Sequence, residues 1–136
     1  MKDQTALPDV RQFLFDNVAT YDELEVLLLL QRRPEVEWSV TTTAQALGLL
    51  ADACQVALEN LAGHGLLVPG GNPITFRYAP ASKELGEAVE QLQRAHGKDR
   101  FAIVQLFSTN AMDRVRAAAI DRLGGALQLR GAKRPR

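Results

Sequence analysis

The sequence predicts a mainly α-helical domain that carries one small β-hairpin. Apolar residues recur at helical spacing near both ends of the chain, over about residues 9–32 and 83–123. Between them, two short helical segments flank Gly48, and two strand-like segments follow, joined by a turn rich in glycine and proline. The chain has 136 residues, of which 46% are hydrophobic, so it is large enough to bury a core. We therefore expect a single domain over residues 1–136.

Two helices are predicted before the first internal break. The spacing of apolar residues indicates a helix over about residues 9–18. Thr20 and Glu23 have the spacing of a capping box, which begins a second helix over Tyr21–Arg32. Pro34 ends this helix. Its leucines are too many for one apolar stripe, so we expect it to be central and covered on two sides.

A short strand, a short helix and a turn are predicted next. Residues 37–40 alternate polar and apolar side chains, which favours an edge strand. Thr42 and Gln45 have capping-box spacing, so a brief helix is expected to run from the threonines to Leu47. Gly48 then supplies a turn, because glycine adopts positive φ at little cost.

A second short helix and a hairpin complete the central segment. The helix is expected over Ala51–Ala62 and has one apolar stripe. Segments 66–68 and 74–78 are expected to pair as strands across the turn at 69–73. The stripe consists of Cys54, Leu58 and Leu61.

The C-terminal part is predicted to be helical. A helix is expected over about Lys83–His96. Gly97 either ends it or only weakens a helix that continues to Ser108, since a glycine inside a helix costs only about 1 kcal/mol relative to alanine. The polar residues 108–110 are expected to break the chain before a last helix over Ala111–Leu123.

The formal net charge is zero, but the charges are unevenly placed along the chain. Residues 1–37 hold four basic and eight acidic residues, residues 38–82 hold one and two, and residues 83–136 hold eleven and six. The C-terminal third is therefore basic and the N-terminal third acidic. This asymmetry is typical of a polyanion-binding segment or of head-to-tail self-association.

Four motifs within residues 41–80 carry a resemblance to a known family. They are Ala46-Leu47-Gly48-Leu49, the stripe of Cys54, Leu58 and Leu61, Gly65-Leu66, and Phe76-Arg77-Tyr78. In this order they resemble the winged helix-turn-helix of small bacterial regulators of the multiple-antibiotic-resistance-regulator type. The resemblance implies a winged-helix core over about residues 21–80. The helices predicted from spacing add a C-terminal part over about 83–123, and the composition indicates a basic tail over 124–136. The resemblance also implies a transcriptional regulator that forms a homodimer through its terminal helices.

Such a fold, where it binds double-stranded DNA, places its second motif helix in the major groove and its wing on the flanking backbone. Lys and Arg contacts to phosphates then supply much of the affinity. The outward face of helix 51–62 has two acids, Asp52 and Glu59, and no base. The expected DNA contacts are Thr42, Thr43, Gln55, Asn60, Arg77, Arg114 and Arg116.

The acidic outward face keeps a second interpretation open. In this alternative the winged helix is a protein–protein interaction module whose acidic motif helix binds a protein partner rather than DNA. The discriminating feature is the electrostatic sign of the surface around Asp52 and Glu59.

No enzyme activity, cofactor or metal site is predicted. The two histidines lie outside any metal-ligand spacing, and the few serines fit strand or cap positions. Cys54 is the single cysteine, and its place on the apolar stripe favours an inert core thiol over a redox sensor. The N-terminus has no apolar signal region and the longest apolar run is too short to span a bilayer. We therefore expect a cytoplasmic protein with no membrane partner.

Overall fold

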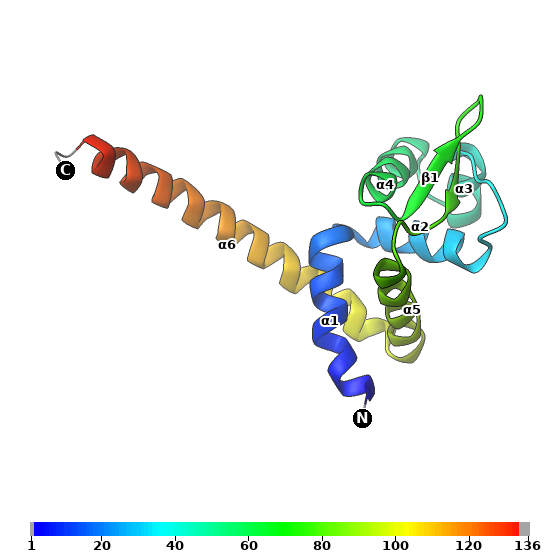
Figure 1. Ribbon diagram of the computed structural model, residues 1–136, viewed down its shortest axis with the longest axis horizontal. Coiled ribbons are helices and arrows are strands. Elements are labelled where there is room, and N and C mark those ends of the chain that lie inside the picture. Colours follow the sequence, from blue (N-terminus) through cyan, green and yellow to red (C-terminus); the bar gives the residue numbers. More distant parts are fainter. Residues whose placement is uncertain (1, 134–136) are drawn as a thin grey trace.

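The computed structural model describes the backbone of residues 2–133 and the side chains of residues 9–122 (Figure 1). The predicted class, mainly α-helical with a small hairpin in a winged helix-turn-helix, is confirmed by the order of the elements. In chain order they are α1 (Lys2–Asn17), α2 (Tyr21–Arg32), α3 (Val40–Leu47), α4 (Ala51–Gly63), β1 (Leu67–Gly70), β2 (Thr75–Tyr78), α5 (Lys83–Lys98) and α6 (Arg100–Lys133).

The hairpin is the wing of the fold. Its strands are antiparallel, with Leu67 opposite Tyr78 at the base and Gly70 opposite Thr75 at the tip. The expected edge strand over residues 37–40 is reduced to a single bridge. There the N–H and C=O of Trp38 exchange hydrogen bonds of 2.8 and 2.7 Å with Phe76.

The α2 helix is central, as predicted. Its buried apolar residues pack against α3, α4 and the wing, and they are Leu24, Val26, Leu27, Leu28 and Leu30. Thr20 is the N-cap, and its hydroxyl accepts a hydrogen bond of 3.1 Å from the N–H of Glu23. The reciprocal bond differs from a simple capping box, because Glu23 accepts from the N–H of Ala19 at 2.8 Å instead of that of Thr20.

The predicted cap of the next helix is wrong by one turn. Ser39, not Thr42, is the N-cap of α3, so Val40 lies in the helix and not in a strand. The Ser39 hydroxyl accepts from the N–H of Thr42, and the Thr42 hydroxyl accepts from the N–H of Ser39, both at 3.0 Å. Pairing with Ser39 satisfies both backbone donors, and Gln45 is not needed. Gly48 ends the helix at φ +70°, as its position predicted.

The chain between residues 83 and 108 forms two helices, which are separated at Asp99. Gly97 lies inside α5, and α6 begins after Asp99, whose carboxylate accepts from the N–H of Ala102 at 3.1 Å. The break expected at residues 108–110 is wrong, because α6 passes through them. Asn110 is fully buried and bonds to α1 instead of capping a helix.

The ends of the chain also differ from expectation. The α1 helix begins at Lys2 and contains Pro8, whose missing N–H costs one backbone hydrogen bond inside the helix. The α6 helix continues through the glycines at 124–125 to Lys133, so the expected tail over 124–136 is helical as far as it is described. Residues 134–136 lie outside the described residues.

Helices α1, α5 and α6 form a second layer below the winged helix (Figure 1). Leu14 of α1, Leu92 of α5 and Ile103 of α6 are buried together with the leucines of α2, so one apolar core joins both layers. Beyond its contact with α1, α6 projects away from the rest of the molecule (Figure 1). Among the described residues, no helix is long and apolar enough to cross a membrane.

Candidate interaction surface

The outer face of α4 is exposed, acidic and partly apolar. Asp52, Gln55, Val56 and Glu59 are exposed along it, with Val56 55% exposed. The amide of Gln55 donates to the carboxylate of Glu59 at 3.1 Å. Leu50, the residue before the helix, is 80% exposed. Because α4 contains no lysine or arginine, this face presents negative charge and apolar area together.

Asn60, an expected DNA contact at the end of that face, is held by a buried carboxylate. Its Nδ2 donates to Oε2 of Glu23 at 3.0 Å. Glu23 is only 4% exposed, and its other oxygen accepts from the N–H of Ala19. One carboxylate thus ties α4 to the start of α2. Sequence spacing gave no sign of this contact, since its partners lie far apart in the chain.

The two threonines expected to contact DNA have different environments. Thr42 is exposed at the start of α3, although its hydroxyl takes part in the Ser39 cap. Thr43 is fully buried, and its hydroxyl donates to the carbonyl of Ser39 at 2.8 Å. The structure therefore corrects the expectation for Thr43, because a buried hydroxyl already bonded to the backbone does not reach a phosphate.

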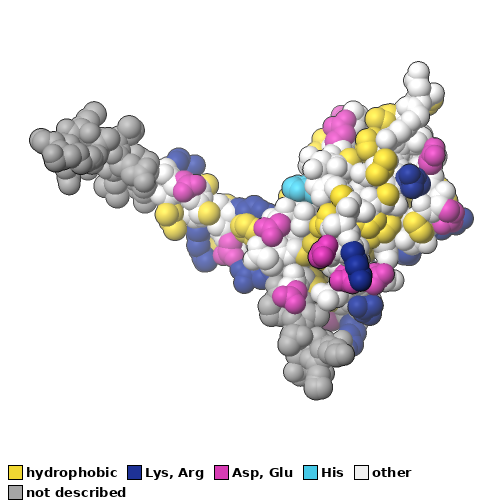
Figure 2. All heavy atoms as spheres, viewed as in Figure 1, with side chains coloured by type: hydrophobic (Ala, Val, Ile, Leu, Met, Phe, Trp, Pro, Cys, Tyr) yellow, Lys and Arg dark blue, Asp and Glu magenta, His cyan; other side chains and the backbone are white. Residues whose placement is uncertain are grey.

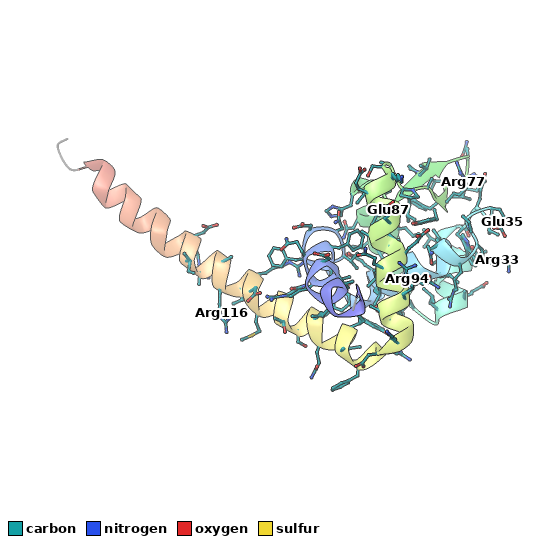
Figure 3. All side chains as sticks on the ribbon, turned by 60° about the horizontal axis from the view of Figure 1, so that its bottom comes forward. Arg33, Glu35, Arg77, Glu87, Arg94 and Arg116 are labelled. Atoms are coloured by element: carbon teal, nitrogen blue, oxygen red, sulfur yellow. The ribbon has the colours of Figure 1, made fainter. Side chains whose placement is uncertain are left out.

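Arg77 is exposed on β2, at the wing. It is the only lysine or arginine in the sequence between Trp38 and Ser82. Figure 3 shows it on the same side of the molecule as Arg33 and Glu35, whose side chains form an exposed ion pair of 3.5 Å. The wing therefore offers one cation of its own, with further charge from the loop after α2.

The two arginines expected on the C-terminal helices are not part of this surface. Arg114 donates to the carbonyl of Phe15 at 2.7 Å and lies over the Phe15 ring, 4.7 Å from its centre, so it caps the end of α1. Arg116 is exposed on α6, 3.5 Å from Asp113. Figure 3 shows Arg116 well separated from Arg77. Within one copy, the α6 arginines and the α4 face are not brought together.

A shallow groove separates the beginning of α2 from α4. Its volume is about 330 Å³. The apolar part is made by Ala53, Val56 and Ala57 of α4, and the carboxylates of Asp22 and Asp52 stand at its edge. Thr20 and Glu23 also line it.

Cys54 lies on the buried side of α4, as predicted for a core thiol. Burial, together with the nearby charge of Asp22, raises the pKa of the Cys54 thiol. A raised pKa disfavours the thiolate, which is the reactive form.

The projecting part of α6 carries an exposed apolar stripe. Met112, Val115 and Ile120 are 55%, 66% and 66% exposed, and Phe101 near the start of the helix is 69% exposed. Figure 2 shows hydrophobic side chains here among basic and acidic ones. Exposed apolar side chains at this density on one helix are typical of a surface that is covered by another chain.

A second hollow, of about 310 Å³, lies where α2 meets the corner between α5 and α6. Arg100 donates to the hydroxyl of Tyr21 at 2.9 Å, and His96 lies 3.4 Å from the same hydroxyl. Burial and the charge of Arg100 lower the pKa of His96, with an opposing effect of Glu25. The tyrosine ring also packs edge-on against Phe107. These contacts fix the corner between the two layers, and no sequence pattern pointed to them.

Within the described residues, no group of three or more histidine, cysteine, aspartate or glutamate side chains is placed to hold a metal ion.

Comparison with known proteins does not assign the chain to a family. No protein-family model and no curated protein matches it. Among solved structures, the transcriptional regulator Tm0710 from Thermotoga maritima is similar at a TM-score of 0.49 and 10% sequence identity, over 97% of this chain and 90% of that chain. A likeness this distant transfers no function.

Proposed function

We propose that this chain is a non-enzymatic, cytoplasmic winged-helix transcriptional regulator that binds double-stranded DNA as a homodimer. The observation that supports the proposal is the exposure of α4 and the wing on a fold whose elements follow the order of winged-helix DNA-binding domains. In this arrangement α4 enters the major groove and the wing lies on the adjacent backbone.

Each proposed contact is made by a residue that is exposed on α3, α4 or the wing. Gln55 carries an amide, which suits the edge of an adenine. Arg77 on the wing pairs with a phosphate. Thr42 lies at the start of α3, where helix N–H groups favour a phosphate. Asn60 joins them only if DNA displaces its bond to Glu23.

The dimer is proposed to form through α6. A two-fold pairing buries the stripe of Met112, Val115 and Ile120 against the same residues of a second copy. Exchange of Val115 for Asp places a charge in that contact and is expected to yield monomers by light scattering. An equivalent exchange at exposed Ala117, which is two residues from Val115 and so lies on the other side of the helix, serves as the control. Unchanged dimer mass in the Val115→Asp variant would refute pairing through this stripe.

DNA binding is tested by fluorescence anisotropy on a random duplex as salt is varied. We expect binding at low salt that weakens as salt increases, because phosphate contacts release counterions. Arg77→Ala is expected to lower the slope of log affinity against log salt by about 1 per protomer, while Gln55→Ala leaves that slope unchanged. No binding by the full chain at low salt would overturn the proposal.

A second function, a protein-interaction module, is favoured by one observation. The face that would read DNA combines the acids Asp52 and Glu59 with exposed Val56 and Leu50, and α4 supplies no cation. Desolvated apolar area with charged edges suits a protein partner, whereas carboxylates repel phosphates.

One double variant separates the two functions. Exchange of Asp52 and Glu59 for Lys replaces repulsion of DNA by attraction, so a DNA-binding protein should bind duplex more tightly. The same exchange should abolish a contact with a basic protein partner. The two functions thus predict opposite signs for a single change.

A further inference from the structure

We propose that the groove between α2 and α4 binds the basic C-terminal segment, residues 122–136, of a second copy of this chain. This inference rests on the second proposed function, in which the α4 face binds a protein. It identifies that protein as a second copy of the same chain.

The groove has the form of a peptide site with an apolar floor and an acidic edge. Ala53, Val56 and Ala57 line a volume of about 330 Å³, and Val56 is 55% exposed. Asp22 stands on the α2 side and Asp52 on the α4 side. An occupant therefore needs small or medium apolar side chains flanked by cations.

The edge charges have no cation from the groove itself. No lysine or arginine lines it among residues 9–122, whose side chains are described, and none occurs in α4. Opposite charges attract each other more strongly at the surface of a protein than in bulk water. A basic segment would thus gain both attraction and cover for the apolar floor, while a DNA phosphate would be repelled.

The last fifteen residues of the chain have the matching chemistry. From Arg122 to Arg136 the sequence contains five basic residues and no acidic one. Leucines at positions 123, 127 and 129 supply apolar side chains between them. No other stretch of the sequence has as many bases without an acid, which is why we choose this occupant over an unrelated protein.

The segment cannot reach the groove of its own copy. The α6 helix has 34 residues, and at 1.5 Å per residue it is about 50 Å long. Figure 1 shows it leading away from α4. In an antiparallel two-fold pair along α6, by contrast, the end of each helix points towards the body of the other copy. Two reciprocal contacts then close the dimer and leave no free groove for further copies.

Carbodiimide crosslinking of the full chain tests the contact directly, since it joins a carboxylate to a lysine amine in close contact. A mixture of ¹⁴N- and ¹⁵N-labelled protein distinguishes crosslinks between copies from those within one copy. We expect mixed-isotope peptides that join Lys133 to Asp22 or Asp52, and their loss at high salt. Crosslinks of Lys133 spread over unrelated acids, or found only within one copy, would overturn the inference.

Charge exchange gives a second measurement by sedimentation equilibrium. Asp52→Lys should weaken self-association at least tenfold, as should the tail variant with Arg130 and Arg134 changed to Glu. Combining them should restore much of it. Glu35→Lys is the matched control, because Glu35 is an exposed acid outside the groove. Equal weakening by the control, or no recovery in the combined variant, would refute the contact.

These outcomes differ from those that test the protein-interaction function. If Lys133 does not reach the groove while the Asp52 and Glu59 double exchange still abolishes capture of a protein partner, the function stands and only the named occupant is wrong. If the double exchange tightens duplex binding and the crosslink is absent, both the protein-interaction function and the contact between the C-terminal segment and the groove are refuted.

Discussion

The bond between Glu23 and Asn60 should be one of the strongest polar contacts between α2 and α4. Glu23 is 4% exposed and accepts two hydrogen bonds, from the N–H of Ala19 at 2.8 Å and from the Asn60 amide at 3.0 Å. A hydrogen bond to a charged group contributes about 1.5–3 kcal/mol, and a buried group left without its partner costs about 1–3 kcal/mol. Removing either partner therefore has a measurable effect on the free energy of unfolding.

The two single substitutions should differ in size. Glu23→Ala removes both bonds and leaves the Ala19 N–H without its partner, so we expect a loss of about 2–4 kcal/mol. Part of this is offset, because the variant no longer buries a carboxylate. Asn60→Ala leaves the Ala19 bond intact and Asn60 is itself exposed, so we expect about 1–2 kcal/mol.

A double-mutant cycle by urea unfolding, followed by circular dichroism, isolates the pair. The double variant should lose less than the sum of the singles by about 1 kcal/mol, because the shared bond is counted once. A coupling below about 0.3 kcal/mol, which is the usual additivity error, would show that the bond contributes nothing in solution. Asn60→Asp is a useful companion, since it sets two carboxylates against each other and should destabilise more than Asn60→Ala at neutral pH.

Three further predictions concern single sites. Gly65→Ala should lower the thermal stability more than Gly48→Ala. Both glycines have positive φ, which costs an alanine about 1–2 kcal/mol, but only at Gly65 would the added Cβ also lie 3.3 Å from Ala81. Equal losses of stability would contradict this close approach. The pKa of His96 is lowered in the folded protein, so as the pH falls the unfolded state takes up the imidazole proton at a higher pH than the folded state does. The contribution of the neutral His96 to stability is therefore present above about pH 6.5 and is lost as the pH falls through the folded pKa. His96→Gln should flatten the pH dependence of unfolding in that window, and an unchanged profile would assign it to other groups. Cys54, fully buried with a raised pKa, should resist iodoacetamide in the native protein and react after unfolding, as followed by mass spectrometry; rapid native labelling would indicate that α4 opens.

Local sequence signals predicted the winged helix well. The Thr20 cap and Pro34 defined α2 correctly, and Gly48 marked the end of α3. Each of these signals acts within one helical turn, so neighbouring residues suffice to identify it. The cap of α3 was misassigned because Ser39 and several threonines compete for the same role, and only the backbone path decides among them.

The break predicted within α6 was wrong because of a tertiary contact. Residues 108–110 have the composition of a helix break, yet α6 continues through them. Asn110 bonds with both the side chain and the carbonyl of Arg11, and these partners are 99 residues away in sequence. Polar residues that end a helix in isolation can lie within one when another helix satisfies them.

The expected surface residues show the same limit. Helical spacing was sufficient to predict which side chains of α4 point outward, and Gln55 and Asn60 are exposed as expected. Their partners were not predictable, because Glu23 and Asn60 meet only after α2 and α4 pack. Arg114 looked like a free cation in the sequence, but its guanidinium is used at the end of α1.

The first third of the sequence is acidic and the last third is basic, and two described contacts of arginines do not offset this separation of charge. One ion pair between the acidic N-terminal third and the basic C-terminal third joins Arg11 to Asp113. This pair uses a base of the acidic third and an acid of the basic third, so it does not bring the excess charges of the two thirds together. Arg114 bonds to neutral carbonyls and so neutralises no acid either. The exposed acids of α4, Asp52 and Glu59, have no lysine or arginine on their own helix. Residues 122–136 hold five basic residues and no acidic one in the sequence. A polyanion would complement only the basic segment, whereas a second copy of the chain would complement both.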